Sequence, residues 1–160
     1  MSNTQPRRRR LTPLFKYQWF LWRVAVPAVS NTTTYGDTLL RHARQWFGRK
    51  FHGVYMRDEV PSDLNGRRPY AIINLDDSKD PNGGSHWIAV AWQPAQRALW
   101  VYDSFGKMHD VPQELLALYG DIVSPTEPDA EQHVDEKNCG ARCLAWLLLA
   151  ECFPRDAPRI

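Results

Sequence analysis

Three side chains that together could cleave a peptide bond are spread over the second half of the chain. Cys139 could supply a nucleophilic thiol, His86 the base that takes its proton, and Asp103 the carboxylate that orients the imidazole. Histidine suits this role because its ordinary pKa lies near neutrality, so its imidazolium can stay beside a thiolate. The residue types therefore predict acyl transfer through a cysteine nucleophile.

The nucleophile candidate opens an apolar segment. The run CGARCLAWLLLAEC extends from Cys139 to Cys152 with no helix breaker after Gly140, which predicts a helix buried in the middle of a domain. Asn138 before it is a favourable N-cap. The helix dipole and the free backbone N–H groups of the first turn stabilise a thiolate at this position. Cys143, one helical turn later, is interpreted as core packing.

Three further residues could support the reaction. The side-chain amide of Gln132 could donate to the oxyanion that forms when a carbonyl is attacked, a contact worth about 3 to 4 kcal/mol in the transition state. Gly140 leaves room beside the nucleophile for an acyl group, and Trp87 could shield the ion pair from water. Each residue alone has an ordinary structural explanation, so it is the combination with the first three that indicates a site.

Two predicted strands bring the histidine and the aspartate together. The segments His86–Trp92 and Leu99–Asp103 are rich in apolar and β-branched residues, and the connection between them contains Pro94 near a turn. In an antiparallel hairpin the start of the first strand faces the end of the second. The Cβ atoms of His86 and Asp103 should therefore lie roughly 5 to 8 Å apart.

The remaining patterns complete an α+β domain. The other expected elements are helices over about 37–47 and 112–119, strands over 51–55 and 70–75, a possible strand over 121–124 and a polar linker over 30–36. We expect one folded domain over residues 36–160, in which a central antiparallel sheet packs on the helix that starts at Cys139. Residues 1–35 are expected to form a separate basic and aromatic arm.

The N-terminal arm is basic and then aromatic. Its four consecutive arginines could bind nucleic acid locally, although the net charge of +2 is too small to imply a polyanionic partner for the whole chain: Arg7, Arg8, Arg9 and Arg10. Residues 11–29 are apolar but interrupted by Lys16, Gln18 and Arg23, so we expect no transmembrane helix and no membrane partner. The segment is interpreted as a surface arm whose aromatic residues pack on the domain or on a partner: Phe15, Trp19, Phe20 and Trp22.

The cysteine content favours a reducing compartment. Three cysteines lie within fourteen residues, and an odd number in one segment is a poor framework for disulfides. We therefore expect free thiols and an intracellular location. A metal site built from Cys139, Cys143 and His133 would lack a second pair of closely spaced ligands, so no metal is expected.

Taken together, these motifs resemble the adenovirus protease (adenain) family. GGSHWIAVAW contains the histidine, YDSFG contains the acid seventeen residues later, and Gln132 precedes the pair Cys139-Gly140 by seven residues. The order His, acid, Gln, Cys is shared with the proteases specific for SUMO and other ubiquitin-like modifiers, and it differs from papain, where the cysteine comes first. The similarity runs from about Thr38 to Phe153.

The resemblance implies a papain-like cysteine protease fold of the adenain and ubiquitin-like-protease type. It implies thiol endopeptidase activity with a catalytic set of four residues: Cys139, His86, Asp103 and Gln132. It further implies a monomeric viral maturation enzyme that cleaves next to glycine in virion precursor proteins, located in the virion and in the host nucleus or cytoplasm. The chemistry itself needs no cofactor, but adenovirus enzymes are activated by DNA and by a peptide that docks through a cysteine.

Three features depart from the family's pattern. Asp103 stands where glutamate is usual, and the segment between Asp103 and Gln132 is shorter. The chain also ends just after the nucleophile helix, so residues 1–29 are expected either to replace some packing of the family's C-terminal helices or to leave a more open groove. No cysteine outside the last helix could dock an activating peptide.

Two other functions are compatible with the sequence. A protease that removes ubiquitin or SUMO-like modifiers would use the same site and would differ only in its substrates. A catalytically inactive protease fold whose basic arm binds nucleic acid has no need of four intact site residues, so their presence favours an enzyme.

Overall fold

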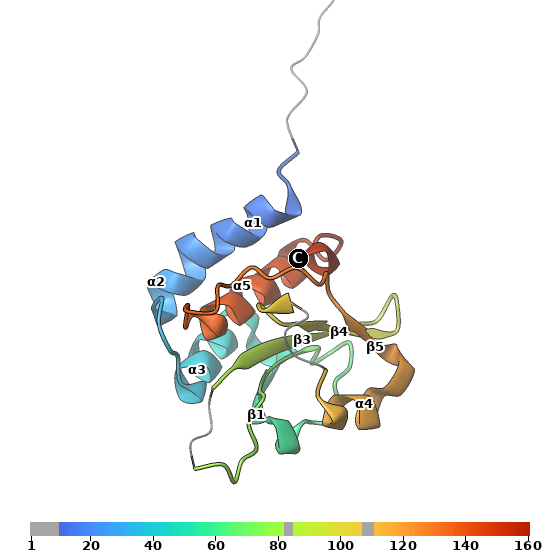
Figure 1. Ribbon diagram of the computed structural model, residues 1–160. Coiled ribbons are helices and arrows are strands. Elements are labelled where there is room, and N and C mark those ends of the chain that lie inside the picture. Colours follow the sequence, from blue (N-terminus) through green and yellow to red (C-terminus); the bar gives the residue numbers. More distant parts are fainter. Residues whose placement is uncertain (1–9, 82–84, 107–110) are drawn as a thin grey trace, which may run out of the picture.

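The computed structural model describes residues 10–81, 85–106 and 111–160, and it shows an α+β fold built on one five-stranded sheet (Figure 1). The strands lie side by side in chain order: β1 (Phe51–Met56), β2 (Tyr70–Asn74), β3 (Trp87–Gln93), β4 (Ala98–Tyr102) and β5 (Val123–Pro125). The helices are α1 (Pro13–Phe20), α2 (Val26–Val29), α3 (Gly36–Phe47), α4 (Gln113–Tyr119) and α5 (Cys139–Cys152), with a π-helical turn, η1 (Leu21–Ala25), between α1 and α2. The helices and strands expected after residue 36 are thus confirmed.

The sheet is mixed rather than purely antiparallel. β2, β3 and β4 pair antiparallel, as expected, but β1 pairs with β2 and β4 pairs with β5 in parallel. Parallel neighbours need a long connection, because the chain must return to the same end of the sheet before the second strand starts. Residues 57–69 and the segment that contains α4 provide these connections. The expectation of an antiparallel sheet is therefore corrected at both edges.

β3 and β4 form the expected hairpin, in which Ala89 lies opposite Tyr102. His86 directly precedes β3, and Asp103 directly follows β4. If this register is extended by one residue, Asp103 lies opposite Ile88. Ile88 follows His86 by two residues, so the side chains of Ile88 and His86 are on the same face of the sheet. The hairpin therefore makes His86 and Asp103 diagonal neighbours.

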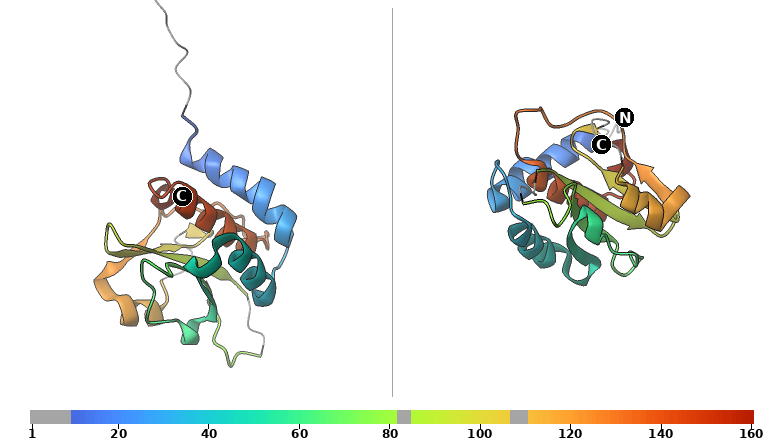
Figure 2. Two further views of the ribbon diagram at one scale, coloured as in Figure 1. Left: turned by 180° about the vertical axis from the view of Figure 1, so that it is seen from behind. Right: turned by 60° about the horizontal axis from the view of Figure 1, so that its bottom comes forward.

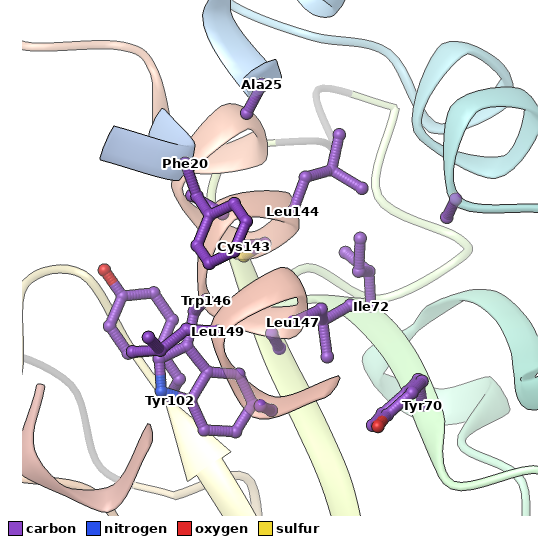
Figure 3. Close-up of a cluster of buried hydrophobic side chains, with 14 of the residues drawn as sticks. Phe20, Ala25, Tyr70, Ile72, Tyr102, Cys143, Leu144, Trp146, Leu147 and Leu149 are labelled. Atoms are coloured by element: carbon purple, nitrogen blue, oxygen red, sulfur yellow. The ribbon is translucent and has the colours of Figure 1, made fainter. Parts of the chain in front are cut away.

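Helix α5 forms the centre of the main core. It lies between the sheet and the N-terminal helices, which explains why its sequence is apolar on nearly every side (Figure 1). Figure 3 shows the side chains gathered around α5, including Phe20 from the N-terminal helices and Ile72 from β2. The rings of Trp146 and Tyr102 stack with their centroids 5.4 Å apart. The nucleophile candidate is thus attached to a rigid, fully packed helix.

The opposite face of the sheet has its own smaller core. Alternate residues of β2 and β3, such as Ile73 and Val90, point to this face and are fully buried. Leu115 of α4 and Leu64 of the loop before β2 cover them. Because both faces of the sheet are buried, the central strands read as continuous apolar runs.

The N-terminal segment is helical and shares the main core. α1, η1 and α2 run along the outer side of α5 (Figures 1 and 2). Of the four aromatic residues expected to pack, Phe20 is buried, whereas Phe15, Trp19 and Trp22 are exposed. Tyr17 is fully buried instead. The division of the chain at residue 35 stays a prediction. In the part of the chain that the structure describes, no helix is both long and apolar enough to cross a membrane.

Candidate active site

The predicted pair of His86 and Asp103 is present. Nε2 of His86 lies 2.7 Å from Oδ1 of Asp103. The same carboxylate oxygen accepts a 2.9 Å hydrogen bond from the backbone N–H of Phe105, whose ring lies 4.7 Å from the imidazole, centroid to centroid. The His86 and Asp103 side chains are only 6% and 12% exposed. The pair is therefore held in a fixed geometry with little access of water.

The surroundings keep the imidazole protonated over a wide pH range. Burial alone would lower the pKa of His86, because burial disfavours the charged form. The hydrogen bonds to Asp103 and Cys139 and the charges of these groups outweigh that effect and raise the pKa of His86 to about 9. Since Nε2 faces Asp103, Nδ1 is the ring nitrogen left for the thiol. An imidazolium between a carboxylate and a sulfur is the arrangement that stabilises a thiolate.

Cys139 is the first residue of α5, and it opens onto a cavity. The cavity has a volume of about 430 Å³ and is lined by Cys139, His86, Gln132 and Trp87, among others. The indole N–H of Trp87 donates a 2.9 Å hydrogen bond to the backbone oxygen of Thr34, which fixes the ring as one wall. The structure thus brings the sequence-predicted residues to one place, while their catalytic roles stay predictions.

Gln132 is held through both ends of its amide. Its Oε1 accepts a 2.6 Å hydrogen bond from the hydroxyl of Ser104, and its Nε2 donates one N–H to the backbone oxygen of Glu136 at 2.7 Å. An amide nitrogen carries two N–H groups, so a second one is available for an oxyanion. Ser104 follows Asp103 directly, and it therefore ties the loop of Gln132 to the end of β4.

A buried arginine that the sequence reasoning missed ties the same loop to α5. Arg142 is only 4% exposed. Its Nε donates to Oδ1 of Asn138 at 2.8 Å, its Nη2 to Oε2 of Glu136 at 3.2 Å, and its Nη1 to the hydroxyl of Tyr17 at 3.3 Å. A charge this deeply buried requires such partners. The sequence feature that could have indicated this buried arginine is a single basic residue within the apolar run of the last helix.

Asn138 occupies the N-cap position of α5, but its side chain does not cap the helix, which corrects the expected role. Oδ1 of Asn138 accepts from Arg142, and Nδ2 donates a 2.6 Å hydrogen bond to Oδ1 of Asn31. Asn138 therefore bridges α5 to the linker that follows α2. Without a side-chain cap, the backbone N–H groups at the start of α5 are left for other acceptors.

Gly140 lies where a larger residue would be tightly packed. A Cβ atom at this position would lie 3.1 Å from Cδ2 of Leu39 and 3.1 Å from Cβ of Thr34. The room it was expected to leave for an acyl group stays a prediction.

Cys143 is fully buried, as expected for a core residue, and burial raises the pKa of its thiol well above the ordinary value. This thiol is therefore a poor nucleophile.

The remaining predicted residues are the N-terminal arginines and His133. Arg7, Arg8 and Arg9 lie outside the described residues, and Arg10 is exposed just before α1. His133 is exposed on the loop before α5. Across residues 10–81, 85–106 and 111–160, no group of three or more His, Cys, Asp and Glu side chains is placed to hold a metal ion.

The site and the comparisons with known proteins point to the same class of protein. A cysteine at the start of a buried helix, beside a histidine paired with an acid, is an arrangement that cysteine peptidases use. Residues 51–120 match the family described as adenovirus endoprotease. This matched region contains His86 and Asp103 and ends before Gln132 and Cys139.

Two adenovirus proteins are similar over a longer region. The chain is 27% identical over 137 residues to the protease of porcine adenovirus A serotype 3, covering 76% of this chain and 66% of that protein. It is 26% identical over 127 residues to the protease of snake adenovirus serotype 1, covering 69% of this chain and 57% of that protein. The chain is therefore distantly similar to adenovirus proteases, and the matched region covers 66% and 57% of the lengths of these two relatives.

Proposed function

We propose that this chain is a thiol endopeptidase with the papain-like fold of the adenain type. The observation that carries the proposal is the position of Cys139 at the start of α5, beside a His86 that is hydrogen-bonded to Asp103. The comparisons support it, because both adenovirus relatives are proteases.

In the proposed reaction, Nδ1 of His86 already holds the proton of the Cys139 thiol, and the thiolate sulfur attacks the carbonyl carbon of the scissile peptide bond. The oxyanion that forms accepts hydrogen bonds from the backbone N–H of Cys139 and from the free amide N–H of Gln132. The imidazolium then gives its proton to the leaving amine, and a thioester remains on Cys139. A water molecule, deprotonated by His86, hydrolyses the thioester and releases the second product.

We propose a substrate with glycine at the cleaved bond. Trp87 and Phe105 form aromatic walls of the cavity around Cys139, and a residue without a side chain passes most easily between such walls. The likeness to two adenovirus proteases favours virion precursor proteins over ubiquitin-like conjugates as the natural substrates. Activation by a peptide or by DNA, and a location in the virion and the host nucleus or cytoplasm, follow from the same resemblance.

The first test uses the three cysteines of the chain as mutual controls. Alkylation by iodoacetamide is followed from pH 5 to pH 9 by peptide mass mapping, in the wild type and in His86→Ala. The proposal expects fast labelling of Cys139 below pH 8 that slows in the variant. Cys152 is exposed and Cys143 is buried, so they report the reactivity of an accessible thiol outside the site and of an inaccessible one.

The second test measures hydrolysis of fluorogenic peptides that carry glycine before the cleaved bond, with and without added DNA. Matched peptides with leucine in place of glycine serve as controls. Equal labelling of Cys139 and Cys152, together with no cleavage of any peptide, would contradict an enzyme and favour the inactive binding fold. Cleavage of the leucine peptides at the same rate would reject glycine specificity alone.

A further inference from the structure

The outer face of the N-terminal helical segment carries a row of exposed apolar side chains. Five large apolar residues there are each between 45% and 54% exposed, which makes them half of the ten such exposed residues in the described part of the chain: Leu11, Leu14, Phe15, Trp19 and Trp22. Phe15, Trp19 and Trp22 follow one another at intervals of four and three residues within α1 and η1, so they share one side of the helical segment, and Leu11 lies just before the start of α1. We call these five residues the apolar stripe.

The same segment is also apolar on its inner side. Tyr17, Phe20, Leu21 and Ala25 are buried between this segment and α5. A helix on the surface of a soluble domain normally has a polar outer face, so a second apolar face indicates a second apolar surface to contact. Figures 1 and 2 show α1 along the outside of the molecule, with α5 on its inner side.

The net charge around the stripe is positive. The first 36 residues contain six basic residues and no acidic residue. Arg10 and Arg23 are exposed near the two ends of the stripe. Lys16 is paired with Asp156, but Arg155 and Arg159 beside that pair add further positive charge to the cavity between the start of α1 and the C-terminal segment. The partner of this face must therefore be both apolar and negatively charged.

We propose that the apolar stripe and its flanking arginines dock on an anionic lipid surface, with the N-terminal helix lying flat on it. Trp, Phe and Leu beside arginine are the composition of helices that bind in the plane of a membrane interface. Basic side chains add attraction to acidic headgroups. The inner face of the helix stays on α5, so the contact is peripheral and needs no membrane-spanning helix. The proposal departs from the expectation, drawn from the sequence alone, that the chain has no membrane partner.

Two other occupants fit the observations less well. A second copy of the chain, paired about a two-fold axis, would place the same positively charged face against itself. Nucleic acid would complement the positive charge, and its bases could stack on Trp19 or Trp22. It would not bury the exposed aliphatic side chains of Leu11 and Leu14. A lipid surface satisfies the charge, the aromatic residues and the aliphatic residues together.

The test is co-sedimentation of the full chain with vesicles of phosphatidylcholine alone or of phosphatidylcholine with phosphatidylserine. We expect binding to the anionic vesicles that weakens with salt, and little binding to the neutral ones. The double variant Trp19→Glu/Trp22→Glu should bind at least about tenfold more weakly, and Arg23→Gln about fivefold more weakly. Leu118→Glu is the matched control, because Leu118 is 46% exposed on α4 and lies outside the stripe; its binding should equal that of the wild type.

Thermal unfolding confirms in each case that the variant is folded. The proposal is overturned if the folded wild type does not bind anionic vesicles, or if the double tryptophan variant binds them as tightly as the control does. If light scattering shows that the wild type is a dimer and that the double tryptophan variant is a monomer, the stripe is instead an interface with a second copy of the chain. Binding to a DNA oligonucleotide that is lost in the same variant would assign it to nucleic acid. None of these measurements depends on peptide hydrolysis, so the outcome is independent of the proposed enzyme activity.

Discussion

The guanidinium group of Arg142 lies 3.3 Å from the hydroxyl of Tyr17, although 125 positions separate the two residues in the chain. Arg142 also bonds to Glu136, whose backbone oxygen accepts the amide of Gln132. The hydroxyl of Tyr17 in turn lies 2.7 Å from that of Tyr102. A continuous set of hydrogen bonds therefore connects the N-terminal helix, the sheet and the loop of the oxyanion candidate.

This network predicts that Arg142 positions the loop without touching the substrate. Arg142→Met would leave the buried Oδ1 of Asn138 without its donor and Glu136 without its charged partner, and we expect a loss of stability of about 3 kcal/mol. Turnover should fall while KM changes little, because the Gln132 amide would no longer be held in place. Arg142→Lys should recover part of the turnover, and Arg41→Met, an exposed arginine on α3, should have no effect. Thermal unfolding and steady-state kinetics measure the two effects separately; a rise in KM alone would contradict the positioning role.

The losses of activity caused by removing the thiol and the imidazole should not be additive. Cys139→Ala and His86→Ala are each expected to remove nearly all hydrolysis, and the double variant should be hardly worse than either, because both residues serve one step. Single-turnover rates of the three variants on a glycine peptide decide the question. Losses that add up in the double variant would mean that the two residues act in different steps.

Loss of the Gln132 amide should slow the chemical step. We expect Gln132→Ala to lower kcat by roughly 10²-fold with little change in KM, as for an oxyanion donor. Ser104→Ala removes only the hydrogen bond to Oε1 and should cost less. A change confined to KM would show that Gln132 binds substrate instead.

Activity should persist to high pH and then decline near pH 9. The raised pKa of His86 keeps the imidazolium charged until the pH approaches about 9, where the ion pair with Cys139 is lost. Asp103→Asn removes the charge that supports this pKa, so the alkaline decline should move to lower pH. The pH profile of kcat/KM for both proteins checks the shift; identical profiles would remove Asp103 from its orienting role.

The same pKa predicts how stability depends on pH. The folded-state pKa of His86 lies above the ordinary unfolded value of about 6.5. The contribution of His86 to stability is therefore complete below about pH 6.5 and is lost as the pH rises through about 9. Thermal unfolding of the wild type between pH 6 and pH 9.5 should show this decline, and Asp103→Asn should show a smaller one. A wild-type stability that rises over that range would contradict the assignment.

Several features of the fold were predictable because they depend on neighbouring residues. The run from Cys139 to Cys152 is apolar on nearly every side, which is typical of a helix enclosed by the domain, and α5 has those bounds. The strand patterns before and after Pro94 predicted a hairpin, and the antiparallel register then placed His86 beside Asp103. Local pattern and simple geometry were sufficient for that pair.

Other features depended on contacts between distant parts of the chain, and only the tertiary structure decided them. The partner of Arg142 could not be read from the sequence, because Tyr17 belongs to a segment whose packing on α5 has no local signal. Asn138 is a favourable cap by residue type, but the buried guanidinium competes successfully for its side chain. The N-terminal segment carries apolar residues on both faces, so its periodicity does not distinguish an inner face from an outer one. Packing against α5 determines which side is buried, so that Tyr17 is buried and Trp19 is exposed.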